Sequence, residues 1–516
     1  MIDSPAPVYV AGAVACASSA WFVWRRLKSE SFPLPPSPRR WPVIGHLLSM
    51  PTKDEHLGFI ELGKKLNSDI IWLETFGMNI IVLNSYEDAA NLLDKRSLIY
   101  SDRVCPMMLK DPSLMYWPDF ILFLNYNEKW RKSRRMMHAW LNKQAAERFQ
   151  PSQQQQARLL LQRLLLRADT LNSSVDLDAE LYRTTAATMT HSIYGYNMKS
   201  ANDPFAFDIK RTTDNGTEAA MLSNFLVNLF PILVHVPDWF PGTGWKRIAR
   251  AWREQKDQAI NSAYNWTKAQ IASGKNEPSM IASWLEQGIE LGFEPNEIER
   301  YVNFVGAALL IGGAETTSKT VLIFFMAMLL FPESQKKAQE EIDSVVGPNR
   351  LPALQDRPRL KYVERLIQEA LRWCPVIPSG IPHASSQEDV YKGYRIPKGA
   401  MVFPNFWAMS RNPEIYPNPE HFNPDRFLDP KVPFAPFFGF GRRSCPGVHY
   451  GEASLFILIA SILATFNIQS LKDEQGNPSL PKAFENAGRL SFDPKPFKLK
   501  LEPRSLLHEE LIRLGA

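Results

Sequence analysis

The segment that most constrains the fold runs from Phe437 to Phe466 and reads FFGFGRRSCPGVHYGEASLFILIASILATF. Its second half, from Tyr450 to Phe466, is mostly apolar and predicts one long helix. Its first half is a loop rich in glycine and arginine that carries Cys445. The chain therefore presents a cysteine in a loop directly before a long apolar helix.

Two features of this loop favour the thiolate form of Cys445. A helix N-terminus carries partial positive charge, and Arg442 and Arg443 lie beside the cysteine in the sequence. Gly441 and Gly447 permit backbone conformations that side chains forbid, and they let a flat molecule approach closely. The pattern predicts a thiolate facing a flat ligand, and a buried structural cysteine is the alternative.

Cysteine content and charge exclude several other classes of protein. The 516 residues include four cysteines, with no C-x-x-C pair and no Cys/His cluster. This content gives neither a disulfide framework nor a zinc site, and it indicates a reducing compartment. A formal net charge of +5 is too small to indicate a nucleic-acid partner.

The N-terminus predicts a membrane anchor followed by a stiff connection. Residues 7–24 are apolar or small and carry no charge, and three basic residues follow within residues 25–28. Such a run can just span a bilayer, and the basic flank places its C-terminal side in the cytosol. We expect residues 1–28 to be a retained anchor, with a buried or interfacial segment as the alternative. Four prolines within residues 29–40 predict a stiff, proline-rich strap.

The rest of the chain, residues 41–516, predicts one large domain that is mainly helical. Residues 128–340 have mostly helical patterns, whereas short strand-like runs occur near residues 70–84 and after residue 388. No linker divides this region into parts. The fold class expected from these patterns is therefore mainly α with small β-sheets.

The sequence from Val302 to Phe331 predicts one long helix with an unusual centre. Apolar residues flank the polar stretch GGAETTSKT, which begins at Gly312. The glycines leave room for a ligand, and the Thr316 hydroxyl can bond to a carbonyl one turn earlier and open the helix locally. We expect a groove that contains a proton donor. A second membrane span is the alternative, which Glu315 and Lys319 in mid-helix make costly.

Phe438-x-x-Gly441-x-Arg443-x-Cys445-x-Gly447 is similar to the haem-binding loop of the cytochrome P-450 family. The resemblance implies that Cys445 is the axial ligand of haem iron, and thus the metal ligand. It further implies that Phe438 packs beside the sulfur, that Arg443 pairs with a haem propionate, and that Gly447 belongs to the cofactor-binding loop.

The polar centre of the long helix resembles the oxygen-binding motif of the same family, Gly312-Gly313-x-Glu315-Thr316-Thr317. By this likeness Thr316 hydrogen-bonds dioxygen and Glu315 helps to relay protons. These two residues are the expected catalytic residues.

Two further pairs resemble family motifs. Glu369 and Arg372 match the Glu-x-x-Arg pair, which in the family joins an arginine in a later segment, here Arg426, and braces the haem side of the fold. Trp130 and Arg134 match the Trp-x-x-x-Arg pair that contacts a propionate.

His383 matches a position where many microsomal members place another propionate partner, and a turn histidine is the alternative. On the helix of Trp130 and Arg134, three basic residues form a separate face: Arg131, Lys132 and Arg135. That face is either a solvated surface or a docking site for an acidic electron donor.

The resemblance covers nearly the whole chain, and the segments EALRWCPVIPSGIPHAS and FNPDRFLDP are similar to fungal microsomal members of secondary metabolism. It implies a single cytochrome P-450-type haem domain on the cytosolic face of the endoplasmic reticulum membrane. The implied cofactor is haem b with a cysteine thiolate ligand. O2 and electrons derived from NADPH are the implied co-substrates.

The implied electron donor is a separate NADPH–cytochrome P-450 reductase, with cytochrome b5 as a second candidate. The chain has no Gly-x-Gly-x-x-Gly after a strand, so it cannot be assigned an NADPH site of its own. The implied reaction is insertion of one oxygen atom of O2 into a C–H bond.

By family analogy, six apolar residues are candidates for substrate contact: Ala307, Ala308, Ile311, Val376, Ile377 and Ile381. Their composition favours an apolar substrate such as a terpenoid or another fungal secondary metabolite. The apolar run FLVNLFPILVHVPDWF, residues 225–240, either joins this pocket or dips into the membrane.

Two other functions remain as alternatives. One is a haem-thiolate isomerase or dehydratase that does not use O2, against which Thr316 argues because such relatives often lack the helix threonine. The other is a haem-binding protein without turnover, in which the pair Glu315–Thr316 has no use.

Overall fold

A computed structural model describes residues 32–200, 203–288, 290, 292–472, 475–486 and 490–515. The predicted membrane anchor, residues 1–28, lies outside the described residues. The described part of the strap runs along the sheet region, where Pro33 O accepts from Arg395 N at 2.8 Å and Pro36 O accepts from Trp72 N at 3.0 Å.

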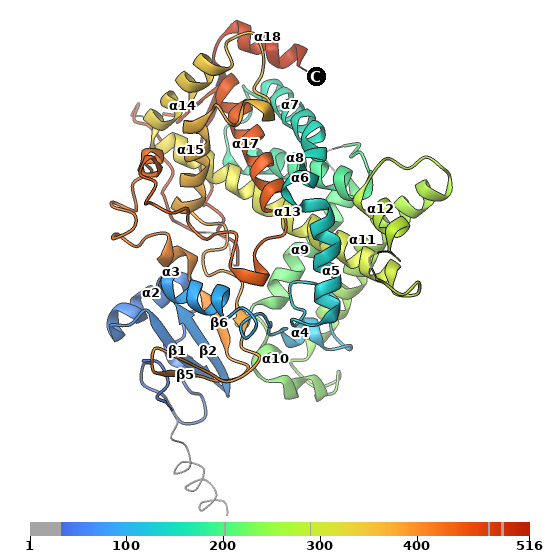
Figure 1. The fold of residues 1–516 in the computed structure, drawn as a ribbon, viewed down its shortest axis with the longest axis vertical. Coiled ribbons are helices and arrows are strands. Elements are labelled where there is room, and N and C mark those ends of the chain that lie inside the picture. Colours follow the sequence, from blue (N-terminus) through green and yellow to red (C-terminus); the bar gives the residue numbers. More distant parts are fainter. Residues whose placement is uncertain are drawn as a thin grey trace, which may run out of the picture.

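Helices make up most of the fold (Figure 1). The α-helices are α2 (Glu55–Leu66), α3 (Tyr86–Ala89), α4 (Met107–Lys110), α5 (Glu128–Leu141), α6 (Lys143–Ala146), α7 (Gln150–Leu166), α8 (Ser174–Tyr194), α9 (Pro204–Ala220), α10 (Leu226–Leu229), α11 (Gly244–Ala272), α12 (Met280–Gln287), α13 (Ile298–Leu330), α14 (Pro332–Val345), α15 (Lys361–Trp373), α16 (Phe406–Met409), α17 (Val448–Thr465) and α18 (Leu506–Leu514). The shorter turns are η1 (Leu47–Ser49), the π-helical η2 (Ala90–Lys95), η3 (Glu147–Phe149), η4 (Pro231–His235), η5 (Leu354–Asp356), η6 (Pro424–Leu428) and η7 (Gly441–Arg443).

The strands form three small sheets. They are β1 (Ile70–Thr75), β2 (Met78–Leu83), β3 (His383–Ala384), β4 (Asp389–Tyr391), β5 (Tyr394–Ile396), β6 (Met401–Pro404), β7 (Phe466–Gln469) and β8 (Lys500–Pro503). The largest sheet has the order β1-β2-β6-β3, and β2 pairs with β6 in parallel, with Ile80 opposite Met401. Two-stranded sheets β4-β5 and β7-β8 complete the set among the described residues. A mainly helical fold with small sheets is therefore confirmed.

The two most apolar helices, α13 and α17, form the centre of the core. Both are long and apolar enough to cross a membrane, yet 67% and 78% of their most apolar stretches are buried inside the protein. Their buried residues pack with those of α7, α14 and α15 in one hydrophobic cluster. Both are therefore core helices, and the predicted alternative of a second membrane span at α13 is wrong.

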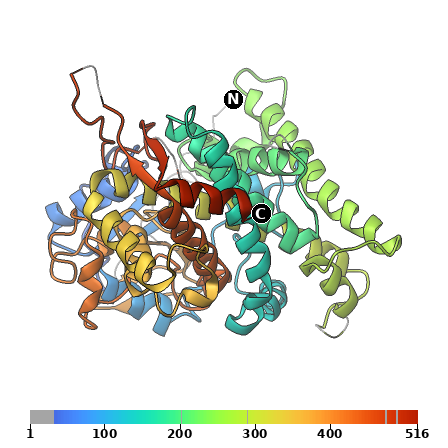
Figure 2. The same ribbon diagram turned by 90° about the horizontal axis from the view of Figure 1, so that it is seen from above.

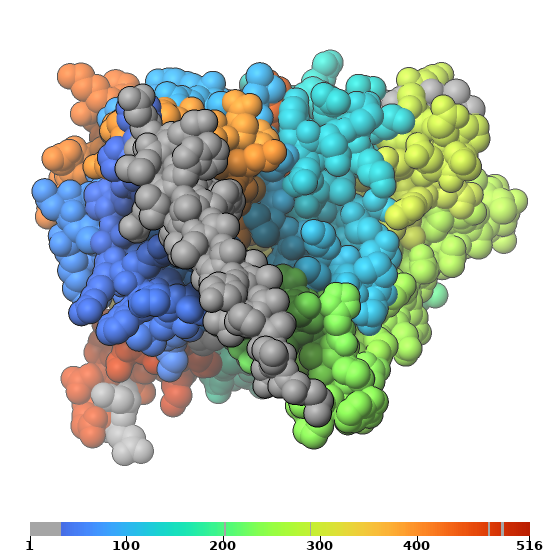
Figure 3. Space-filling model, turned by 90° about the horizontal axis from the view of Figure 1, so that it is seen from below, coloured from blue at the N-terminus to red at the C-terminus, as the bar shows by residue number. Residues whose placement is uncertain are grey.

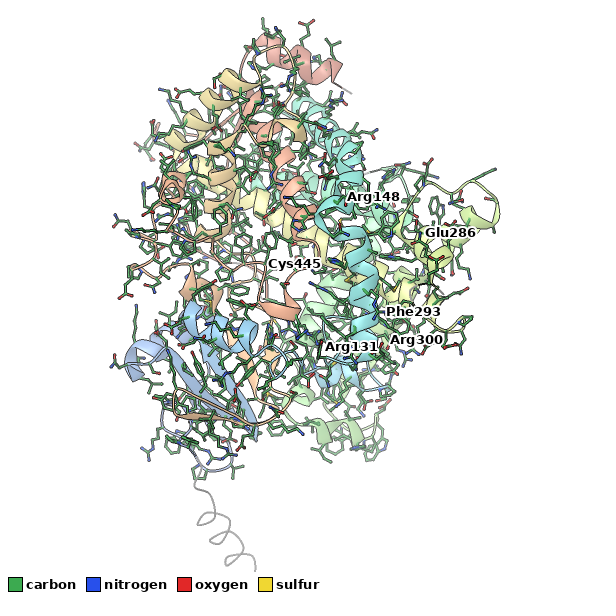
Figure 4. All side chains as sticks on the ribbon, in the orientation of Figure 1. Arg131, Arg148, Glu286, Phe293, Arg300 and Cys445 are labelled. Carbon is green, nitrogen blue, oxygen red and sulfur yellow. The ribbon has the colours of Figure 1, made fainter. Side chains whose placement is uncertain are left out.

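The arrangement brings distant parts of the chain together. Figure 2 shows the N-terminal segments (blue) and the segments after β6 (orange) on one side of the molecule, with α9, α11 and α12 (green to yellow-green) on the other. The long helix α13 packs against α8 in between. This layout places the loop before α17 near the middle of the molecule, beside α5 (Figure 4).

Candidate active site

The cysteine loop is held in a defined shape before α17. The backbone N–H of Cys445 donates to Phe438 O at 2.7 Å. Gly441 N donates to Asp94 Oδ1, and Gly441 has a φ of +52°. A Cβ on Gly441 would lie 2.3 Å from Leu93 O, so this glycine is required by the close contact with η2. The sequence pattern predicts that Gly441 makes room for a flat ligand, whereas in the structure the close contact with Leu93 of η2 is what requires a glycine.

The charge near the Cys445 sulfur comes from a different residue than predicted. Burial raises the pKa of the Cys445 thiol, while the Gly447 backbone N–H and the charge of Arg134 lower it. Arg442 lies over the Tyr126 ring instead, and Arg443 donates to the carbonyl of Ser101 at 2.7 Å. The thiol pKa remains above its ordinary value, so the prediction that the loop alone favours the thiolate is wrong, because burial outweighs the nearby positive charge. A bound metal ion would stabilise the anion.

One stripe of the buried helix α13 is open. Gly312 is exposed, a Cβ built on it would meet no atom within 4 Å, and Ala308 and Thr316 above and below it are partly exposed. The spacing of four residues puts all three on one face. The Thr316 hydroxyl donates to Gly312 O at 2.7 Å, as predicted. The helix continues through this turn, so the groove results from the absent side chain of Gly312 and not from an opened helix.

Gly313 faces the opposite way. A Cβ on Gly313 would lie 2.6 Å from the Met189 side chain, so this glycine allows α13 and α8 to pack closely. The two glycines of the motif therefore have different roles: Gly312 opens the groove, and Gly313 serves helix packing.

Glu315 is the carboxyl group adjacent to Thr316, and its surroundings favour the protonated form. Burial raises the pKa of Glu315, and nearby charges adjust it: Lys210 and Lys319 lower the pKa, whereas Asp214 and Asp178 raise it. A raised pKa lets a carboxyl keep its proton to a higher pH than an ordinary glutamate, so it can serve as a proton donor.

Beside the cysteine loop, three arginines and a tryptophan converge. Arg134 of α5 donates to Ser444 O. The guanidinium of Arg443 lies 4.7 Å from the centre of the Trp130 ring. Arg103, from the loop before α4, is buried and donates to Ile381 O at 2.6 Å. Burial and mutual repulsion lower the pKa of Arg103 and of Arg443, the latter to about 9.

His383 lies at the same cluster in a neutral state. Burial lowers the pKa of His383 well below its ordinary value, and Arg103 and Arg443 lower it further. The Nδ1 atom lies 2.7 Å from Tyr100 O, and because a carbonyl oxygen can only accept, Nδ1 carries the proton. In this neutral state Nε2 has no proton to donate to an anion such as a propionate. A carboxylate beside the ring would raise the pKa of His383.

The predicted Glu-x-x-Arg residues form a buried ion network. Glu369 accepts from Arg372 through two bonds of 2.7 Å and from Arg426 Nε at 3.0 Å, and all three side chains are buried. Arg372 also donates to Ser410 O at 2.9 Å. This network fastens α15 to η6 and to the segment that follows α16.

The predicted substrate contacts divide into two groups. Ala307 is buried in a cluster with Trp117, Phe120 and Val227, whereas Ala308 and Ile311 are partly buried at its edge. Val376 and Ile377 belong instead to the main core, and the Ile381 carbonyl binds Arg103. The open stripe of α13 is thus bordered by an apolar cluster from α4, the loop after it, α9 and α10.

The model of the family described as cytochrome P-450 matches residues 35–501 of this sequence. This chain belongs to the cytochrome P-450 family. It is 36% identical over 507 residues to cytochrome P-450 monooxygenase 208 of Postia placenta, which covers 97% of this chain and 96% of that protein. It is 35% identical over 489 residues to cytochrome P-450 monooxygenase claR of Ampulloclitocybe clavipes, which covers 93% and 88%.

A solved structure of a zebrafish cytochrome P-450 with abiraterone has the same fold. The TM-score is 0.70 at 22% sequence identity, and the match covers 87% of this chain and 100% of that chain. This likeness shows the fold, and the family match and the fungal relatives identify this chain as a haem-thiolate monooxygenase, an oxidoreductase that incorporates oxygen.

The side chains of this cytochrome P-450 fit a haem. Arg103 Nε is buried without a hydrogen-bond partner among the described residues, and Arg103 and Arg443 each lie close enough to another arginine of this cluster for its charge to lower their pKa, although Asp102 partly offsets this for Arg443. The paired propionates of a haem would satisfy both conditions. Gly312 leaves a stripe of α13 open, and Cys445 would supply a sulfur ligand from a fixed loop.

Arg103 is the cofactor-binding candidate that the sequence did not indicate. It lies in a loop with no helical spacing to Trp130 or Arg134, so no pattern connects it with them. In the sequence, the neighbouring Asp102 is the one nearby feature that marks Arg103 as notable. In the structure, Asp102 Oδ1 accepts a hydrogen bond from Tyr126 N at 2.8 Å.

Proposed function

We propose that this chain binds haem b through Cys445 and inserts one atom of O2 into a C–H bond of an apolar small molecule. The proposed substrate class is a terpenoid or another fungal secondary metabolite. The proposed electrons come from NADPH through a separate reductase, with cytochrome b5 as a second donor. The observation that carries the proposal is the Thr316 hydroxyl on the open turn of α13, next to a carboxyl with a raised pKa.

The haem supplies the redox and oxygen-activating chemistry when it is bound. The chain supplies the rest. Cys445 donates its sulfur from a loop fixed by the bond to Phe438. Arg103, Arg134 and Arg443 would neutralise the propionates. The Thr316 hydroxyl, which donates to Gly312 O in the structure, would turn from that carbonyl to present its proton at Oγ1, and the Glu315 carboxyl is the proposed source that replaces this proton.

Substrate selection is proposed to depend on apolar contacts. The cluster beside the open stripe contains Trp117, Phe120 and Val227, and its members are almost all hydrocarbon. Apolar side chains that border a binding site favour ligands that bind by burial of apolar area. This composition supports an apolar ligand.

Replacing Thr316 by alanine tests the proton-delivery role. We expect the Thr316→Ala enzyme to keep its haem but to lose at least about tenfold in product formed per NADPH, since a positioned proton donor contributes that much or more. The missing electrons should appear as hydrogen peroxide, measured alongside product and NADPH.

Thr317→Ala is the matched control. Thr317 lines a small cavity of mixed polar and apolar lining, with Gln153, Thr185 and Met189, on the side of α13 away from the open stripe. Its product yield should stay within about twofold of the parent. An unchanged yield in Thr316→Ala would contradict the assigned role.

A basic surface beside the cysteine loop is the proposed docking site for the electron donor. We define the α5 basic surface as the exposed residues Arg131, Arg135, Arg148 and Arg442. Arg131 and Arg442 lie over the same ring, that of Tyr126, at 5.7 Å and 5.3 Å. Figure 4 shows Arg131 and Arg148 towards opposite ends of α5, with Cys445 beside that helix. A donor with an acidic face would therefore dock close to the sulfur.

Charge reversal on this surface should slow electron delivery selectively. We expect Arg131→Glu combined with Arg442→Glu to lower the reductase-driven rate about tenfold at low salt, and less at high salt, because exposed charges are screened. Turnover driven by added hydrogen peroxide should not change. Lys500→Glu, on β8, is the control; an equal loss in the peroxide-driven rate would refute the docking role.

We propose that the enzyme sits on the endoplasmic reticulum membrane by an anchor in residues 1–28, with its catalytic part in the cytosol. Exposed apolar side chains support contact with lipid: Phe32, Val43, Leu48, Leu226, Ile232, Trp239 and Phe240. The N-terminal segment (blue) and the segment around α10 and η4 (green), which carry them, lie on one face in Figure 3. Lys246 braces the second segment through bonds of 2.6 Å to the carbonyls of Val234 and Val236.

A further inference from the structure

Lys319 is a buried cation one turn after Glu315 on α13, and none of the roles above uses it. Its side chain is 9% exposed. Its ammonium lies 2.9 Å from Asp178 Oδ2 of α8 and 2.6 Å from Asp493 Oδ1, in the segment before β8. Burying an ammonium is costly unless it is paired, and these two carboxylates pair it. Three separate parts of the chain therefore meet at one ammonium.

The segment of Asp493 also contacts the stretch that borders the substrate candidates. Phe492 N donates to Val376 O at 2.6 Å, and Asp493 N donates to Asn486 Oδ1 at 3.0 Å. Lys319 thus connects the turn of α13 that carries Glu315 to the segment that holds the Val376 carbonyl.

The ion group at Lys319 has an excess of negative charge, because two carboxylates face one ammonium. Asp178 Oδ1 is buried and has no hydrogen-bond partner among the described residues. Removing Lys319 would leave Asp178 and Asp493 near each other without their cation, and Asp178 acts on Glu315. Removing the charge of Asp178 would leave the ammonium paired with Asp493 alone.

Glu315 faces charges on three helices. On α13 itself the charge is Lys319, which shares its face at a spacing of four residues. From α9 it faces Lys210 and Asp214, which pair with each other at 3.2 Å. From α8 it faces Asp178 and the Tyr182 hydroxyl. Lys319 lowers the pKa of Glu315, and Asp178 raises it.

We propose that Lys319 is a positioning residue for proton delivery, because its ammonium holds Asp178 and Asp493 together and so fixes the charge around Glu315 and the segment beside Val376. The inference rests on the proposed proton relay through Glu315. A relay carboxyl must lose and regain its proton near the working pH. A fixed cation beside it keeps the ionised form within reach.

Opposite charge changes test this inference. We expect Lys319→Gln to shift the alkaline limb of product formed per NADPH to higher pH, because loss of the cation raises the pKa of Glu315 further and the protonated carboxyl is the proposed donor. On that limb the yield should exceed the parent yield at the same pH, and below the limb the two yields should be equal. Asp178→Asn should shift the same limb downward, and Lys319→Arg should restore the parent profile.

Each enzyme is first checked for its thiolate-haem spectrum, which reports a folded haem site. Lys337→Gln is the matched control, since Lys337 forms an exposed pair with Asp425 at 3.0 Å on α14. Shifts of Lys319→Gln and Asp178→Asn in the same direction, or no shift of Lys319→Gln, overturn the inference. If Lys319→Gln does not fold, the absence of a downward shift in Asp178→Asn overturns it. Glu315→Gln distinguishes failure of the Lys319 inference from failure of the proposed proton relay. If the product yield of Glu315→Gln is unchanged across pH, the relay through Glu315 is wrong.

Discussion

Replacing Cys445 by alanine abolishes the thiolate-haem spectrum and lowers product formation by at least about a thousandfold. The sulfur is the proposed axial ligand, and the cofactor supplies the chemistry only while it is ligated. The loop itself should persist, because its shape depends on the Cys445 backbone N–H, which an alanine retains, and on Gly441 packed against η2. The absorption spectrum of the purified, reduced protein measures this result.

Cys374→Ala is the control for the loss of a buried thiol. Cys374 is buried in the main core, and burial raises the pKa of its thiol well above the ordinary value. Its replacement removes one small apolar contact and should leave the spectrum unchanged. Retention of the thiolate spectrum in Cys445→Ala, or its loss in Cys374→Ala, would contradict the ligand assignment.

Replacing Glu369 by alanine should cause the largest loss of stability. Glu369 is fully buried and accepts from Arg372, from Arg426 and from the backbone N–H of Asn423 at 2.8 Å. Its removal leaves two buried guanidiniums without their carboxylate, which costs about 3–5 kcal/mol. The midpoint of urea unfolding of the holoenzyme should fall accordingly, and haem should be lost at lower temperature.

Glu364→Gln offers the matched comparison on the same helix, α15. Glu364 pairs with Arg357 at 2.8 Å, but both side chains are partly exposed, at 27% and 28%. Such pairs contribute about 0–1 kcal/mol, so the unfolding midpoint should hardly move. Equal losses in the two variants would show that burial of the Glu369 network has no special weight.

Local patterns predicted the long elements well, and long-range contacts were out of reach. The helices expected at residues 302–331 and 450–466 occur as Ile298–Leu330 and Val448–Thr465, because apolar length alone requires a buried helix. The parallel pairing of β2 with β6 joins Ile80 to Met401, across more than half of the chain. Neither strand carries a signal that names its partner.

The same division applies to the site. Thr316 bonds to Gly312 as its spacing of four residues predicts, because both atoms belong to one helix. The place of Arg103 in the site and the reason why residue 441 must be glycine could not be predicted from the sequence. Each depends on a contact with a segment distant in sequence, Ile381 for Arg103 and Leu93 for Gly441. The charge at the sulfur was assigned to neighbouring Arg442 and Arg443, but it comes from Arg134, because the loop turns those two side chains away.

The most direct test of the central claim is a reduced, carbon-monoxide difference spectrum of membranes that contain the full chain. A strongly red-shifted Soret band is the predicted result, because a cysteine thiolate opposite carbon monoxide donates electron density to the haem. A band typical of histidine-ligated haem, or no haem band from folded protein, would contradict the assignment of Cys445 as the ligand.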